Sequence, residues 1–135
     1  MEARIAKLAP GLAALHASPW CGSIEEVGTG SWVQALLQSV AGASASLAIG
    51  RSSYGRDVQA HLYGAFERSI ARATVESWAR QNLASGPHRF ALAISGAVAS
   101  PLQRGDQHAW LALACSDGRG RTLHLRCREP LRLQQ

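Results

Sequence analysis

The chain has 135 residues, of which 47% are hydrophobic and 17% are charged, and this balance excludes intrinsic disorder. No apolar run approaches the roughly 18 residues of a membrane-spanning helix, and the first residues lack a signal-peptide apolar segment, so a cytoplasmic protein without membrane contact is expected. The net charge is +5, but the arginines are spread along the chain, which favours a solvated surface over a nucleic-acid-binding patch.

Apolar periodicity and turn residues predict helices alternating with strands. Helices are expected near residues 3–16, 33–40, 58–66 and 74–83, and buried strands at 45–49 and 90–94. Pro10 is expected to kink the first helix or delay its start, Asp57 to cap the third helix and Thr74 to start the fourth. The expected inner face of the third helix consists of Val58, Leu62, Ala65 and Phe66.

The last third of the chain predicts a β-hairpin. Asp117-Gly118-Arg119-Gly120 is typical of a turn between strands at 110–115 and 121–127. The first of these strands is apolar on both faces and is expected inside the sheet, with the second nearer an edge. If Ser116 pairs with Arg121, one apolar face of the hairpin consists of Trp110, Ala112, Ala114, Leu123, Leu125 and Cys127. The element order predicts an α/β layered domain with a mixed sheet.

A run of small residues opens the second predicted helix. It reads Glu26-Val27-Gly28-Thr29-Gly30-Ser31. Small residues allow a ligand to approach the backbone, and the free N–H groups of a helix start favour an anion such as phosphate or carboxylate. Thr29 or Ser31 is expected to cap the helix. A capped loop without a ligand explains the same pattern.

Several motifs follow one another in a recognisable order. The 26–31 run is followed by Ser53-Tyr54, by Leu62-Tyr63-Gly64-Ala65, by the stretch 91–96 and by Ala109-Trp110-Leu111-Ala112-Leu113. Together they resemble the CinA C-terminal family, which includes nicotinamide mononucleotide deamidases, over about residues 9–128. The resemblance implies a three-layer α/β/α fold with a mixed sheet. It also implies a single domain over residues 1–135 in which the family's C-terminal helix is truncated.

The resemblance also implies a chemistry that this chain departs from. The family typically reads Glu-Ser-Cys-Thr-Gly-Gly in the first motif, and its serine attacks the carboxamide of nicotinamide mononucleotide without a metal or cofactor. A lysine and a tyrosine of the second motif assist proton transfer. Here Val27 stands at the serine position and Gln59 at the lysine position. Loss of both groups predicts a catalytically degenerate domain retained for nucleotide binding or protein interaction.

The expected ligand is a pyridine mononucleotide or another small phosphate-bearing molecule. Its expected site consists of Glu26, Gly28, Thr29, Gly30, Ser31, Tyr54, Arg56, Ser95 and Gly96. Arg56 is expected either to bind phosphate or to pair with Glu26, and a homo-oligomer is expected. Two alternatives stay open: an active amidohydrolase with a relocated nucleophile, and a basic nucleic-acid-associated protein. No Cys/His cluster has metal-ligand spacing, and each histidine is expected to be exposed or structurally hydrogen-bonded.

Overall fold

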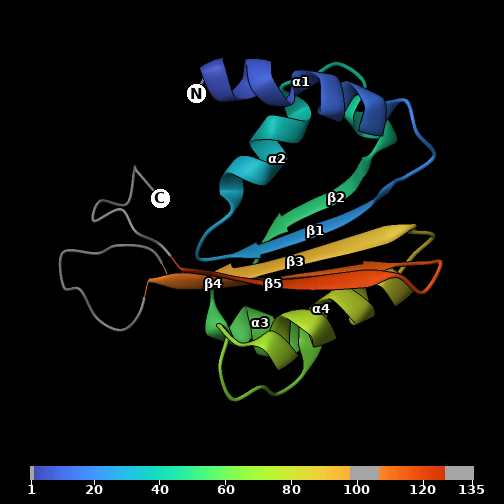
Figure 1. Cartoon of the computed structure of the whole chain (residues 1–135). Coiled ribbons are helices and arrows are strands. Elements are labelled where there is room, and N and C mark those ends of the chain that lie inside the picture. The colour runs from blue at the N-terminus through green and yellow to red at the C-terminus, as the bar shows by residue number, and fades with distance from the viewer. Residues whose placement is uncertain (1, 98–106, 127–135) are drawn as a thin grey trace.

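The computed structural model describes residues 2–97 and 107–126, so the expected truncated C-terminal helix lies outside the described residues. Five helical segments and five strands follow one another (Figure 1). In chain order these are α1 (Glu2–His16), β1 (Gly22–Val27), α2 (Ser31–Gln38), η1 (Ala43–Ala45), β2 (Leu47–Ser52), α3 (Arg56–Tyr63), α4 (Arg72–Ala84), β3 (Phe90–Gly96), β4 (His108–Cys115) and β5 (Gly120–Arg126). Among them no helix is long and apolar enough to cross a membrane.

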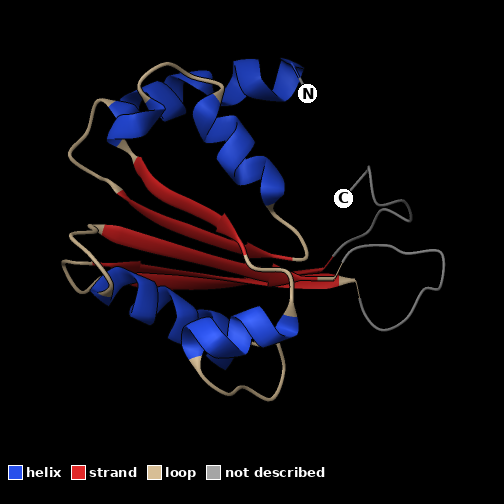
Figure 2. Ribbon diagram, turned by 180° about the vertical axis from the view of Figure 1, so that it is seen from behind, coloured by secondary structure: helices blue, strands red, loops and turns tan. Residues whose placement is uncertain are grey.

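The five strands form one mixed sheet in the order β2-β1-β3-β4-β5. β1 pairs in parallel with both β2 and β3, whereas β3–β4 and β4–β5 are antiparallel. Helices α1 and α2 lie on one face of the sheet, and α3 and α4 lie on the other (Figure 1, Figure 2). This arrangement confirms the expected three-layer α/β/α fold, with β4 inside the sheet and β5 at its edge.

The densest core lies between the sheet and α4. Its buried members are Val27, Val75, Trp78, Ala79, Ala93 and Ala112. The ring of Trp78 stacks on Tyr63 at a centroid distance of 5.0 Å and meets Phe66 edge-on at 5.6 Å. Such aromatic pairs add to the free energy of apolar burial. Val75, Trp78 and Ala79 form the inward face of α4, the helix expected at 74–83.

The opposite layer is joined by a buried histidine. His16, at the end of α1, lies 2.9 Å by its Nδ1 from the Ser46 hydroxyl and 2.9 Å by its Nε2 from the Leu37 carbonyl oxygen. These contacts connect α1, α2 and the segment before β2, which confirms for His16 the expected structural role. α1 begins at Glu2 and continues through Pro10, so the proline does not delay its start.

The expected hairpin register is wrong. Cys115 donates its N–H to the Arg119 carbonyl and accepts from Gly118, whose φ is +87°, so the loop contains three residues and a left-handed glycine. The strands consequently pair Leu113 with Arg121 and Trp110 with His124. Because the shift is an odd number of residues, Leu123 and Leu125 lie on the face of Leu111 and Leu113 rather than under Trp110. The expectation for Cys127 falls outside the described residues.

Three further local predictions are wrong. β2 starts at Leu47 and is a largely exposed edge strand, not a buried one, because only β1 flanks it. α3 ends at Tyr63 and buries Gln59, leaving Val58 51% and Leu62 37% exposed. No side chain caps α3 or α4: Gly55 precedes the first, and the second begins at Arg72, before Thr74.

Candidate functional site

The motif residues meet at the carboxyl ends of the parallel strands. β1 leads into α2 on one face of the sheet, whereas its neighbour β2 leads into α3 on the other face (Figure 2). Connections that diverge in this way leave a crevice outside the strand ends, where α/β proteins commonly bind ligands. The first two sequence motifs therefore lie where the topology favours a site.

Two glycines allow the segments at these strand ends to approach one another. Gly28 has a φ of +77°, and a Cβ there would lie 2.2 Å from the carbonyl oxygen of Gly96 and 4.0 Å from the ring of Tyr54. A Cβ at Gly96 would lie 2.4 Å from the methyl group of Thr29. Four of the predicted site residues are thus within contact distance. Larger side chains at either glycine would force these segments apart.

The start of α2 differs from the expectation. Gly30 is the N-cap, with a φ of 94°, and no side chain caps the helix, so the predicted capping by Thr29 or Ser31 is wrong. The left-handed glycine turns the chain directly into the helix, and Val33 donates its N–H to the Gly30 carbonyl. Ser31, the first helical residue, is exposed. The first-turn N–H groups therefore lack a side-chain acceptor, which is the condition for anion binding at a helix start.

The position of the family's nucleophile carries no reactive group. Val27 is 6% exposed, and its side chain belongs to the core beneath α4. Ser95 lies beside it in register on β3 and is fully buried, with a hydroxyl oxygen that has no hydrogen-bond partner among the described residues. Neither residue offers an accessible oxygen at the crevice.

Gln59 stands where the resemblance expects a lysine. It is buried, and both the nitrogen and the oxygen of its side-chain amide are hydrogen-bonded. Its Nε2 donates to the Ser53 carbonyl at 2.8 Å and to the Tyr54 carbonyl at 3.2 Å, while its Oε1 accepts from Ser69 at 3.1 Å. The amide therefore fixes the β2–α3 corner against the loop after α3. A neutral group held in this way is no proton acceptor for catalysis.

Arg56 lies on the α3–α4 side of the sheet. Its guanidinium donates to the Phe66 and Glu67 carbonyls at 3.3 and 3.2 Å, and it lies 4.6 Å from the Phe66 ring centroid. The suggested ion pair with Glu26 is wrong, because Glu26 is buried on the other face and contacts Gln34 of α2. Burial raises the pKa of Glu26, opposed by the Gln34 hydrogen bond and reinforced by repulsion from Glu25.

Sequence reasoning missed Glu25, the neighbour of Glu26. Its carboxylate is 1% exposed and accepts from Arg51 Nε at 2.6 Å, from the Ser53 N–H at 3.0 Å and from the Tyr63 hydroxyl. Asn82 of α4 donates to the same hydroxyl at 2.8 Å. The network fixes the corner that presents Tyr54. Adjacent residues of a strand face opposite sides, so a pair of glutamates was a signal that one carboxylate enters each layer.

Of the predicted site residues, the structure gathers Gly28, Thr29, Tyr54 and Gly96, with Gly30 and Ser31 at the adjoining helix start. Gly30 also packs closely on Ile94, 3.1 Å from the position of its missing Cβ. The other three predicted residues lie elsewhere: Glu26 faces α2, whereas Arg56 and Ser95 lie on the α3–α4 side of the sheet. Over residues 2–97 and 107–126, no group of three or more histidine, cysteine, aspartate or glutamate side chains is placed to hold a metal ion.

Comparison with known proteins rests on structure. No protein-family model matches the sequence, and no curated protein does so either. The competence/damage inducible protein CihA from Agrobacterium tumefaciens superposes with a TM-score of 0.75 at 23% identity, over 90% of this chain and 80% of that one. A CinA superfamily protein from Klebsiella pneumoniae gives 0.75 at 21% identity, over 93% and 84%. A competence or damage-inducible protein from Enterobacter asburiae gives 0.76 at 15%, over 93% and 84%.

Proposed function

On the fold that this chain shares with the CinA proteins, we propose that the domain binds a small anionic ligand without hydrolysing it. The ligand class is a pyridine mononucleotide or another phosphate-bearing molecule of that size. The observation that carries the proposal is Val27, an isopropyl group 6% exposed where the resemblance calls for an attacking serine. An apolar side chain enclosed in the core forms no acyl intermediate.

The surrounding hydroxyls support the absence of hydrolysis. Ser95 is fully buried and Ser53 is 4% exposed, so a bound substrate reaches neither oxygen. Gln59 supplies no base, because its amide is neutral and hydrogen-bonded to two carbonyls. Catalytic groups of this kind act together, and the loss of one lowers the rate by several orders of magnitude. These contacts argue against Ser53, Ser95 and Gln59 as replacement catalytic groups.

Two features support binding. The start of α2 has no side-chain cap, and Tyr54, which lies close to Gly28, is 69% exposed. A phosphate is favoured by the N–H groups and positive dipole end of the helix. An exposed aromatic ring next to that position offers a stacking surface to a pyridine ring.

Titration calorimetry tests this proposal with nicotinamide mononucleotide, nicotinate mononucleotide and nicotinamide riboside, which lacks the phosphate. We expect both nucleotides to bind and the riboside to bind at least about tenfold more weakly, since hydrogen bonds to a charged group contribute about 1.5–3 kcal/mol. Tyr54→Ala should weaken nucleotide binding by about three- to tenfold. The matched control is Ile49→Ala, an exposed apolar side chain on β2.

An ammonia assay run on the same samples separates the two halves of the proposal. Release of ammonia from nicotinamide mononucleotide at an enzymatic rate would overturn the claim that hydrolysis is lost. Equal affinity for nucleotide and riboside, or no heat with any of the three, would overturn the phosphate site. Unchanged binding in Tyr54→Ala would remove the stacking role alone.

Self-association remains part of the proposal. The outward face of α3 carries Val58 and Leu62, which are 51% and 37% exposed and four residues apart on the helix. Contact between two copies would cover these side chains. Sedimentation velocity should show a concentration-dependent oligomer that a Val58→Glu/Leu62→Glu double variant dissociates, and a monomer at all concentrations would contradict the expectation.

A further inference from the structure

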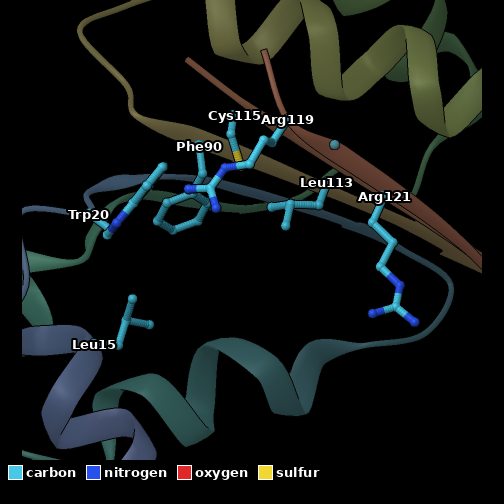
Figure 3. Close-up of a pocket in the computed structure, with 8 residues that line it drawn as sticks. Leu15, Trp20, Phe90, Leu113, Cys115, Arg119 and Arg121 are labelled. Atoms are coloured by element: carbon cyan, nitrogen blue, oxygen red, sulfur yellow. The ribbon is translucent and has the colours of Figure 1, made fainter. Parts of the chain in front are cut away.

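A cavity lies at the opposite end of the sheet from the candidate site. It has a volume of about 420 Å³ and opens between the end of α1 and the β4–β5 turn (Figure 3). Its lining consists of Leu15, Trp20, Phe90, Leu113, Cys115, Arg119, Gly120 and Arg121. Cavities of about 300–1,000 Å³ are typical of sites for small organic molecules.

The cavity lies on the face of the β4–β5 hairpin that no helix covers within residues 2–97 and 107–126. α4 packs under the sheet, where it covers Ala112, while Leu113 and Leu123 on the opposite face are 37% and 41% exposed. Leu15 lies across from Phe90 and Leu113, and Trp20 lies beside Phe90, so apolar groups border the cavity on both sides (Figure 3). Filling this space with an apolar group would remove Leu15 and Leu113 from water, which is favourable.

Two arginines border the apolar walls, and they differ in their partners. Arg119 already has two partners: its Nε forms an ion pair with Asp117 at 2.8 Å, and its guanidinium lies 5.7 Å from the ring centroid of Trp20. Arg121 pairs with Leu113 across the antiparallel strands β4 and β5, and its side chain lies beside that of Leu113 (Figure 3). The guanidinium of Arg121 makes no hydrogen bond or ion pair with any residue in the part of the chain that the structure describes.

We propose that this cavity binds a small molecule with an apolar body and a single anionic group, such as a carboxylate or sulfonate. The apolar body lies between Trp20 and Phe90, and the anion pairs with Arg121. The charge selects an anion over a neutral or cationic molecule, because the guanidinium is the only rim charge without a partner among the described lining residues. The cavity is open to solvent, and its volume of about 420 Å³ matches a small organic molecule. This site is separate from the proposed nucleotide site and does not depend on it.

Fluorescence titration with anilinonaphthalene sulfonate, an apolar aromatic anion, tests the cavity directly. Decanoate should displace the probe, and decanol, its uncharged counterpart, should displace it at least about tenfold more weakly, as expected for one lost charge-assisted hydrogen bond. Arg121→Ala should weaken decanoate by the same factor and leave decanol unchanged. Arg80→Ala is the matched control, because Arg80 is an exposed arginine of α4 on the far layer. Leu113→Glu should abolish both.

A second readout places the ligand. Saturating decanoate should slow the alkylation of Cys115, which lines the cavity, when the modified peptides are measured by mass spectrometry. Equal affinities for decanoate and decanol, or equal losses in the Arg121 and Arg80 variants, would overturn the anion site. Unchanged alkylation of Cys115 would overturn the location. Exclusion of the probe by a dimer that Leu113→Glu dissociates would overturn the small molecule in favour of a second copy of the chain.

Discussion

The two adjacent glutamates of β1 should respond oppositely to the same substitution. Glu25→Gln removes a buried charge that accepts from Arg51, from the Ser53 N–H and from Tyr63. Breaking a buried ion pair costs about 3–5 kcal/mol. The Arg51 side chain is 37% exposed and can be solvated, and the amide oxygen keeps one hydrogen bond, so we expect a loss of about 2 kcal/mol. For a domain of this size that lowers Tm by roughly 8 °C.

Glu26→Gln should be neutral or stabilising at pH 7, because Glu26 is 4% exposed and its Oε2 has no hydrogen-bond partner among the described residues. Burial raises the pKa of Glu26 above 4.5. At pH values between the pKa of Glu26 in the unfolded chain and its higher pKa in the folded protein, the folded state binds more protons than the unfolded state. The free energy of unfolding therefore falls as pH rises through this range. The glutamine variant lacks this fall, and its advantage should disappear near pH 4.

Urea denaturation followed by tryptophan fluorescence, at pH 7 and at pH 4, measures both variants. An unchanged m-value would show that the substitutions alter stability and not the extent of unfolding. Equal losses of stability in the two variants at pH 7 would refute the reasoning, because it would mean that the partners of each carboxylate do not decide its contribution.

The remaining predictions concern two glycines, Gly28 and Gly118, and the half-buried Tyr63. Gly28→Ala should cost at least about 2 kcal/mol, since its Cβ would lie 2.2 Å from a carbonyl oxygen, whereas Gly118→Ala, with open space and a φ of +87°, should cost only about 1 kcal/mol of strain. Similar losses on urea denaturation would contradict this. Burial and the Glu25 hydrogen bond raise the pKa of Tyr63 from 10.0 to about 12. Stability should therefore fall as pH rises from 10 to 12, a loss that Tyr63→Phe should lack; ultraviolet titration showing every tyrosine ionised by about pH 10 would exclude it.

The sequence predicted best those elements whose burial follows a simple period. Val75 and Trp78 are buried in α4 as the helical spacing indicated, and β4 is an interior strand because both its faces are apolar. The order of motifs also indicated the three-layer arrangement. The same reasoning failed for α3, where Val58 is exposed and Gln59 buried, because the inward face is chosen by hydrogen bonds to Ser53 and Tyr54 rather than by apolarity.

The residues of the candidate site likewise fall into two groups: those whose position the sequence predicted and those whose position it did not. Gly28, Tyr54 and Gly96 come from three strand ends that a parallel sheet must bring to one edge, so their proximity followed from the fold that the sequence indicated. Arg56 and Ser95 were expected to join them, and the structure turns both toward the α3–α4 layer. The face on which a side chain lies depends on strand register, and no local pattern contains that information.

The sequence by itself determined the fold class, the helix and strand positions with strong periodicity, and the presence of an apolar residue, Val27, where the resemblance expects a serine. The tertiary structure alone decided the partners of Glu25, the hairpin register and the cavity beside Arg121. The physical reason is the separation along the chain of the residues that determine each feature. Periodicity is set by residues within one turn or two strand positions, whereas Glu25 meets Tyr63, 38 positions away in the chain, only after the layers pack together.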